Sequence, residues 1–91
     1  MERLYLTFGS DHAEAAAKGD HPLPAHWVST SGFGIIEAPT YRMAHAIAHA
    51  ITDSRFAFDY PERIWEGKGH AAKWYPDGPA FRITYQDGEE A

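Results

Sequence analysis

The segment from Thr40 to Thr52 constrains the fold more than any other part of the sequence. Pro39 stops the preceding segment, and the Thr40 hydroxyl can accept a hydrogen bond from the free amides of a first helical turn. At about 100° per residue, Arg42, His45 and His49 fall on one flank. The opposite stripe is apolar and consists of Ala44, Ile47, Ala48 and Ile51. The spacing predicts an amphipathic helix that packs through this alanine and isoleucine stripe.

Alternating segments on both sides of this helix predict short strands. Residues 4–8 alternate large apolar side chains with Tyr5 and Thr7, and residues 33–38 form an apolar run before Pro39. Residues 56–60 place an aromatic side chain at every second position. We expect the aromatic face of this third strand to cover the helix.

Two shorter helices and a hairpin complete the expected elements. Asp11 can cap a helical turn that ends near Ala17, and Pro61 suits the first position of a helix running to Glu66, with Trp65 buried. Residues 76–79 read Pro-Asp-Gly-Pro, which favours a turn between residues 72–75 and 80–85. We interpret these flanking segments as a β-hairpin.

Together these elements predict one α+β domain over residues 1–91. We expect an antiparallel or mixed sheet of about four or five short strands, with the helix near residues 40–52 packed on one face and an acidic tail at 87–91. A core this small leaves dimerisation through an edge strand open. The expected core residues are Leu4, Leu6, Phe8, Ile35, Ala44, Ile47, Ile51, Phe56, Phe58, Phe81 and Ile83.

The charge balance and the missing cysteines exclude several classes of protein. Eight Lys and Arg against thirteen Asp and Glu give a net charge of −5, which argues against binding to nucleic acid and favours a basic protein partner. Without cysteine there is no disulfide framework, thiolate metal site or cysteine nucleophile. No apolar run approaches the roughly 18 residues of a membrane span, and the first residues lack the pattern of a signal peptide. We expect a cytoplasmic protein that does not bind membranes.

Histidines provide the main candidates for site chemistry. His45 and His49 lie four residues apart on the predicted helix, a spacing that lets two imidazoles share one metal ion. The zinc-protease pattern needs a glutamate after the first histidine, and Ala46 stands there instead. Three further histidines, at 12, 21 and 26, lie in a loop-rich stretch with no nucleophile placed beside them. The favoured interpretation is therefore a non-enzymatic protein without a cofactor, and a metal site at His45 and His49 is the alternative.

Three stretches read together suggest a relationship: YLTFGSDH at residues 5–12, IIEAPTYRMA at 35–44 and RFAFDY at 55–60. The order resembles small uncharacterised accessory proteins of bacteriophages and prophages, with a TFG strand and a following histidine, a second strand, a Ser/Thr-capped helix and an aromatic strand. This resemblance implies a protein that binds and disables a host factor, such as an anti-CRISPR or other anti-defence inhibitor. The implied partner is a host protein, for example a basic, nucleic-acid-binding defence effector.

The expected partner-binding residues combine carboxylates with large aromatic side chains. They are Asp59, Glu62, Trp65, Glu66 and Trp74. Carboxylates suit a basic partner surface, and tryptophan suits the centre of an interface. The two tryptophans also allow an alternative, in which the protein sequesters a small nucleotide-like ligand by stacking.

Overall fold

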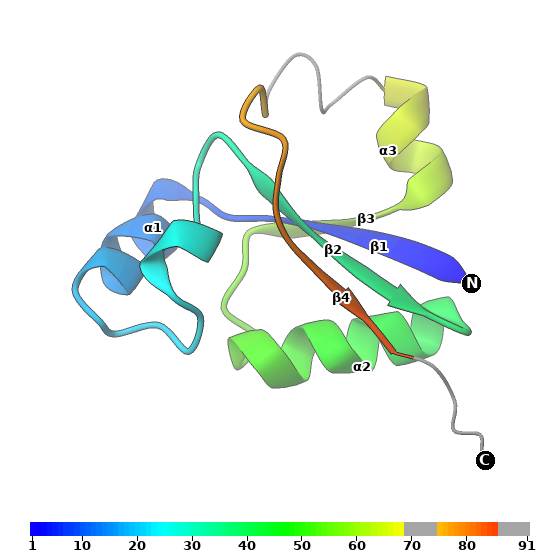
Figure 1. The fold of residues 1–91 in the computed structure, drawn as a ribbon, viewed down its shortest axis with the longest axis horizontal. Coiled ribbons are helices and arrows are strands. Elements are labelled where there is room, and N and C mark those ends of the chain that lie inside the picture. Colours follow the sequence, from blue (N-terminus) through cyan, green and yellow to red (C-terminus); the bar gives the residue numbers. More distant parts are fainter. Residues whose placement is uncertain (69–74, 86–91) are drawn as a thin grey trace.

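A computed structural model of the chain describes residues 1–68 and 75–85. The chain alternates strands with short helices, in an order that can be followed in Figure 1. The elements are β1 (Glu2–Thr7), α1 (Ser10–Ala17), a 3₁₀ turn η1 (Ala25–Trp27), β2 (Phe33–Ala38), α2 (Tyr41–Thr52), β3 (Phe58–Pro61), α3 (Glu62–Lys68) and β4 (Pro79–Thr84).

The four strands form one mixed sheet in the order β3-β1-β2-β4. β1 runs antiparallel to both of its neighbours, and β4 runs parallel to β2. Consequently β2 and β3 point the same way with β1 between them, and α2 connects them across one face. The predicted α+β class with a mixed sheet and a helix packed on it is confirmed.

Helices cover the sheet on both faces. In Figure 1, α2 lies below the strands and α3 lies above them, while α1 and η1 lie at one end of the sheet. β1 is accordingly buried on both sides: Leu4 and Leu6 face α2 with no exposed surface, and Tyr5 faces α3 at 7% exposure. A strand that alternates apolar side chains with a buried tyrosine can occupy this central place because both of its faces are packed.

The core on the α2 side is formed by small helix residues against larger strand residues. Ala44 and Ala48 are completely buried, which brings α2 close to the sheet, while Ile47 and Ile51 lie half-buried beside them. The Thr40 hydroxyl accepts a hydrogen bond from the Met43 amide at 3.1 Å, as the sequence predicted. Phe8 and Phe81 extend this core toward α1 and η1.

The core on the α3 side is almost entirely aromatic. Among the described residues, five rings contact one another here, and we call them the aromatic cluster: Tyr5, Phe33, Tyr60, Trp65 and Tyr75. The prediction that Trp65 is buried is confirmed at 3% exposure. Ile35 was expected in the core and is buried, but it lies on this face and not on the α2 face.

The prediction that the aromatic face of the third strand covers the helix is wrong. β3 begins at Phe58, and its register places Tyr60 opposite Tyr5 and Phe58 opposite Thr7. Because side chains alternate along a strand, this register turns Tyr60 toward the aromatic cluster and away from α2. Phe58, expected in the core, is 62% exposed, and Phe56 packs against the α2 core from outside the strand.

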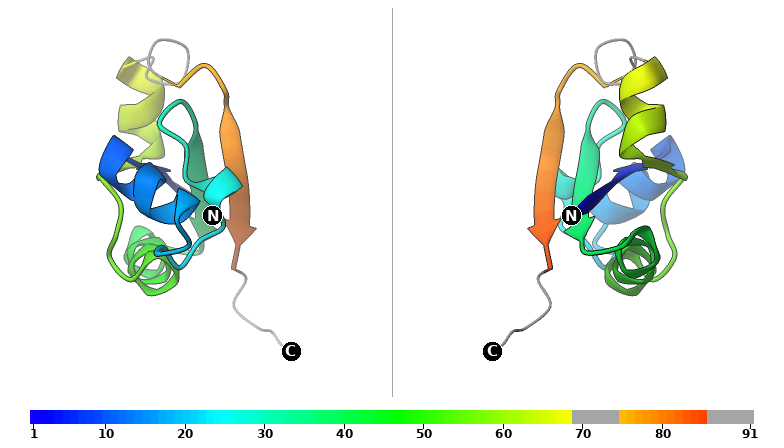
Figure 2. Two further views of the ribbon diagram at one scale, coloured as in Figure 1. Left: turned by 90° about the vertical axis from the view of Figure 1, so that its left-hand side faces the viewer. Right: turned by 90° about the vertical axis from the view of Figure 1, so that its right-hand side faces the viewer.

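The hairpin interpretation of β4 is also corrected. The expected turn forms, with the Gly78 amide donating to the Tyr75 carbonyl at 3.2 Å and Gly78 at φ +74°. However, β4 pairs in parallel with β2, and Figure 2 shows it as the outermost strand. The reason is topological. β3 and β4 lie at opposite edges of the sheet and are connected through α3, so β4 runs in the same direction as β3 and therefore parallel to β2. Residues 72–74, the other part of the expected hairpin, lie outside the described residues.

Candidate functional site

The candidate partner-binding residues are concentrated on β3 and α3. Asp59 belongs to β3, and Glu62, Trp65 and Glu66 belong to α3, which follows without a loop. Trp74 lies outside the described residues. The structure therefore places the described candidates on one continuous segment, although their side chains have different surroundings.

Trp65 lies in the middle of the aromatic cluster. Its ring stacks on Tyr5 with centroids 5.0 Å apart and planes 6° apart, and on Tyr75 at 5.4 Å and 28°. Phe33 and Tyr60 approach it at 4.8 and 5.6 Å. With four rings against it and 3% of its surface exposed, this indole holds α3 on the sheet and offers no open ring face for stacking a base.

Glu62 belongs to an ionic network on the side of the sheet that α3 covers. The Arg3 guanidinium donates through Nη1 to Glu62 and through Nε to Glu37, both at 2.6 Å. Arg82 donates to Glu37 from β4 at 2.7 Å, and the Thr84 hydroxyl donates to it at 2.8 Å. This network ties β1, β2, β4 and α3 together through Glu37, which is the least exposed of its charged side chains.

Hydrogen bonds to the charged form shift the pKa values in this network. Those from Arg82, Arg3 and Thr84 lower the pKa of Glu37 from 4.5 to about 2. The hydrogen bonds that Arg3 donates to Glu37 and Glu62 raise the pKa of Arg3. Burial, followed by the nearby Glu62 charge, raises the pKa of the Tyr5 hydroxyl at the border of the aromatic cluster.

The folded protein stabilises the ionised form of Glu37 more than the unfolded chain does. Lowering the pH should therefore reduce the free energy of unfolding. The stabilisation is complete above pH 4.5 and is lost as the pH falls toward about 2. We expect Glu37→Gln to cost about 1–2 kcal/mol of unfolding free energy at pH 7 and much less near pH 2. Urea unfolding at a series of pH values measures the difference. Glu14→Gln, on the exposed side of α1, is the control, and an equal pH dependence in both variants would contradict this role.

Asp59 contacts a histidine of the neighbouring helix. Its Oδ2 lies 2.9 Å from Nδ1 of His45, so β3 and α2 are joined at the surface. His49 uses its own Nδ1 to contact the Ser54 hydroxyl at 2.9 Å. Within residues 1–68 and 75–85, no three histidine or carboxylate side chains gather closely enough to hold a metal ion.

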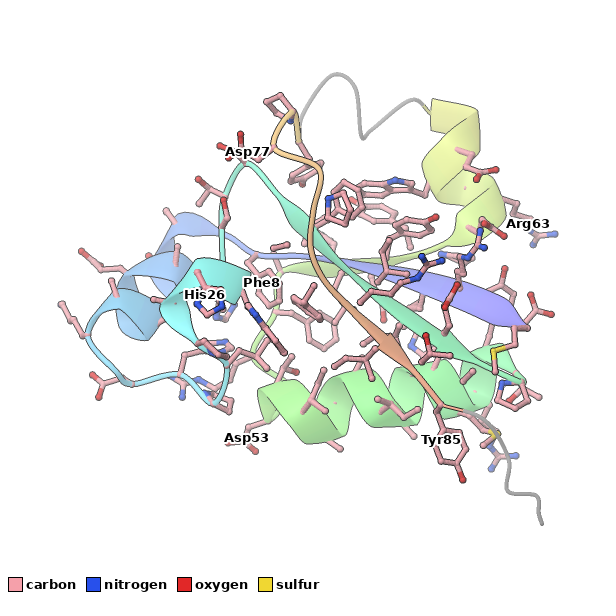
Figure 3. The ribbon with its side chains drawn as sticks, in the orientation of Figure 1. Phe8, His26, Asp53, Arg63, Asp77 and Tyr85 are labelled. Carbon is pink, nitrogen blue, oxygen red and sulfur yellow. The ribbon has the colours of Figure 1, made fainter. Side chains whose placement is uncertain are left out.

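The histidines of the loop-rich stretch are not arranged around a nucleophile. His21 is buried, with Nδ1 accepting from the Leu23 amide at 3.1 Å and Nε2 lying 2.8 Å from the Arg55 carbonyl oxygen. Because an amide can only donate, Nε2 must carry the proton and donate to Arg55. His21 thus fastens the loop after α1 to the chain after α2. His12 lies against the His21 ring, and His26 is exposed on η1 (Figure 3).

Two large apolar side chains on the same segment are exposed, and one of them, Phe58, was expected in the core. Phe58 on β3 is 62% exposed and Ile64 on α3 is 38% exposed. The Phe58 ring lies 6.2 Å from Tyr60, so it continues the aromatic cluster outward to solvent. Alternation along residues 56–60 could not reveal this, because it marks one face of a strand without indicating whether that face is covered.

Comparison with known proteins finds no matching family model, no similar curated protein and no similar solved structure. In the part of the chain that the structure describes, no helix combines the length and apolar character needed to cross a bilayer.

Proposed function

We propose that this protein binds and inhibits a host protein without catalysing a reaction, as a phage-type accessory protein of the anti-CRISPR or another anti-defence class. The observation that carries this proposal is the exposed Phe58 on an edge strand that continues directly into an acidic helix anchored by Trp65. We use the name β3–α3 surface for the exposed side chains Phe58, Ile64 and Glu66 of this segment, of which Ile64 and Glu66 lie on opposite flanks of α3 because they are two residues apart. The resemblance of the sequence to phage accessory proteins supports the biological class.

The composition of the β3–α3 surface suits a protein partner. Most of the Phe58 side chain is exposed to water, so covering it with a partner would stabilise the complex. Aromatic side chains are also enriched at the buried centre of protein interfaces. The aromatic cluster beneath it holds β3 and α3 in place, so binding does not have to order this segment first. The surface is therefore suited to rigid docking.

The charge of the segment indicates which partner it fits. Residues 58–66 contain three carboxylates and one basic residue, Arg63, which Figure 3 shows directed outward from α3. With a net charge of −5 for the chain, long-range attraction favours a basic partner and speeds the encounter. A defence effector with a basic nucleic-acid channel has this character.

The structure also separates the carboxylates by accessibility. Asp59 contacts His45, and Glu62 contacts Arg3, so reversing either charge would disturb contacts within the fold. Glu66 is exposed on α3 and is the suitable position for charge reversal. The matched control is Glu14, an exposed glutamate on α1.

The test is phage plaquing on bacterial strains that each carry one active defence system and express this protein. We expect plaquing to rise at least tenfold on one strain, and Phe58→Ala or Glu66→Lys to abolish the rise, while Glu14→Lys leaves it unchanged. Circular dichroism spectra should be the same for all variants. Unchanged plaquing on every strain would overturn the inhibitor proposal, and equal loss with Glu14→Lys would overturn the assignment of the surface.

A further inference from the structure

We propose that His45 and His49 form a binding site for one divalent transition-metal ion of the Cu²⁺, Ni²⁺ and Zn²⁺ class. Both residues lie on α2, one helical turn apart, on the side of the helix that faces β3 and the chain leading to it. Side chains at this spacing have Cβ atoms about 5–6 Å apart, which allows two imidazoles to reach a common ion. This site is separate from the β3–α3 surface and does not depend on the proposed inhibitor function.

The contact with Asp59 presents His45 in the form that binds a metal. An ionised carboxylate can only accept a hydrogen bond, so the neutral His45 ring must donate from Nδ1 to Asp59 over the observed 2.9 Å. Its Nε2 then carries the lone pair. A carboxylate behind the far nitrogen of an imidazole is the usual support of a metal-binding histidine, because it fixes both the tautomer and the ring orientation.

The end of α2 gives His49 a similar support. Asp53 and Ser54 both adopt left-handed backbone angles, with φ of 54° and 61°, which turns the chain back over the last helical turn. The Ser54 amide donates to the His49 carbonyl at 3.0 Å, and the Ser54 hydroxyl lies 2.9 Å from Nδ1. Phe56 packs against the ring at 5.1 Å, so the imidazole is held from two sides with Nδ1 occupied. When Nδ1 donates to the Ser54 hydroxyl, which can accept as well as donate, Nε2 carries the lone pair and is the metal ligand.

The ligand set determines which ions fit and how tightly. Imidazole nitrogens suit copper, nickel and zinc, and the affinity of such a site is highest for Cu²⁺. Two protein ligands leave the remaining coordination positions to water or to a donor from another molecule. We therefore expect reversible binding at one site, weaker than in a structural zinc site with four protein ligands.

Other histidines of the described chain lack this arrangement. Both nitrogens of His21 are already used, one by the Leu23 amide and the other by the Arg55 carbonyl, so the neighbouring His12 has no second imidazole with which to share an ion. His26 is exposed on η1 and lies against Trp27. It is the matched control for a single exposed histidine.

Isothermal titration of the untagged protein with Cu²⁺, Ni²⁺ and Zn²⁺ tests the site. We expect one equivalent to bind, with Cu²⁺ tightest, and His45→Ala or His49→Ala to weaken binding at least tenfold. Asp59→Asn should weaken it about tenfold through loss of the carboxylate support. His26→Ala should leave it unchanged.

A second test uses the native protein, so its result does not depend on whether a variant folds. Substoichiometric Cu²⁺ should broaden the NMR signals of the His45 and His49 rings before those of His26. The proposal is overturned if all histidine signals broaden together, if a His45→Ala/His49→Ala double variant binds as tightly as the native protein, or if no ion binds at millimolar concentration.

Discussion

Gly34→Ala is expected to destabilise the protein by about 3 kcal/mol, the upper part of the usual range for overpacking a core. An alanine Cβ at Gly34 would overlap the end of the Phe81 ring, which lies directly over this glycine. The ring has little room to move, because it is 6% exposed and stacks on Trp27 with centroids 4.9 Å apart. Urea unfolding followed by circular dichroism measures the loss.

Gly9→Ala is the matched control, since its added Cβ would meet only the Ala57 Cβ at 4.0 Å and its φ of −83° suits any residue. Because Gly9 is the N-cap of α1, where alanine is less favourable than glycine, this variant should lose no more than about 1 kcal/mol. Adding Phe81→Leu to Gly34→Ala should recover part of the stability, because the smaller side chain leaves room for the methyl group. If the changes in unfolding free energy of the two substitutions simply add, the Phe81 ring is not what disfavours alanine at position 34.

Trp65→Ala is expected to cost about 3–5 kcal/mol, the usual range for removing a large buried aromatic side chain. The indole is the centre of the aromatic cluster, and its removal leaves a cavity between α3, β1 and β2. Trp65→Phe should cost less, because a smaller ring keeps part of the stacking on Tyr5. Urea unfolding compares the two variants under the same conditions.

Phe58→Ala is the control for Trp65, because it removes an exposed ring from the same segment. It should change the unfolding free energy by no more than about 0.5 kcal/mol, as surface substitutions usually do. The two aromatic residues thus separate packing from binding: Trp65 should affect stability, and Phe58 should affect inhibition. A Trp65→Ala variant with native stability would contradict the place of this residue in the core.

The side chains of α3 that were expected to bind a partner together are divided between the core and the surface. Trp65 and its acidic neighbours were expected to act together on a partner, but they point into different surroundings. Trp65 is covered by four rings, Glu62 contacts Arg3, and Glu66 is exposed. A seven-residue helix lying on a sheet must bury part of its surface, and its only large aromatic side chain fills that role.

Local sequence signals were sufficient for the elements whose causes are local. The Thr40 cap and the alanine and isoleucine stripe predicted α2 closely, because capping and amphipathic spacing act within a few residues. The apolar run before Pro39 predicted β2, and the Pro-Asp-Gly-Pro stretch predicted the turn with Gly78 at positive φ. The histidine pair at 45 and 49 was also evident, because its spacing depends only on the helix.

Strand pairing and side-chain environment were decided by the tertiary structure. The sequence by itself determined an α+β chain with one strong helix, but it left open which strand lies at the centre and which face of each strand is covered. The pairing of β1 with β3 turned Tyr60 inward, left Phe58 in water and brought Asp59 to His45. The parallel pairing of β2 with β4 brought Arg82 to Glu37. These contacts join residues far apart in the chain, and their register follows from the packing of both sheet faces at once, which no local pattern records.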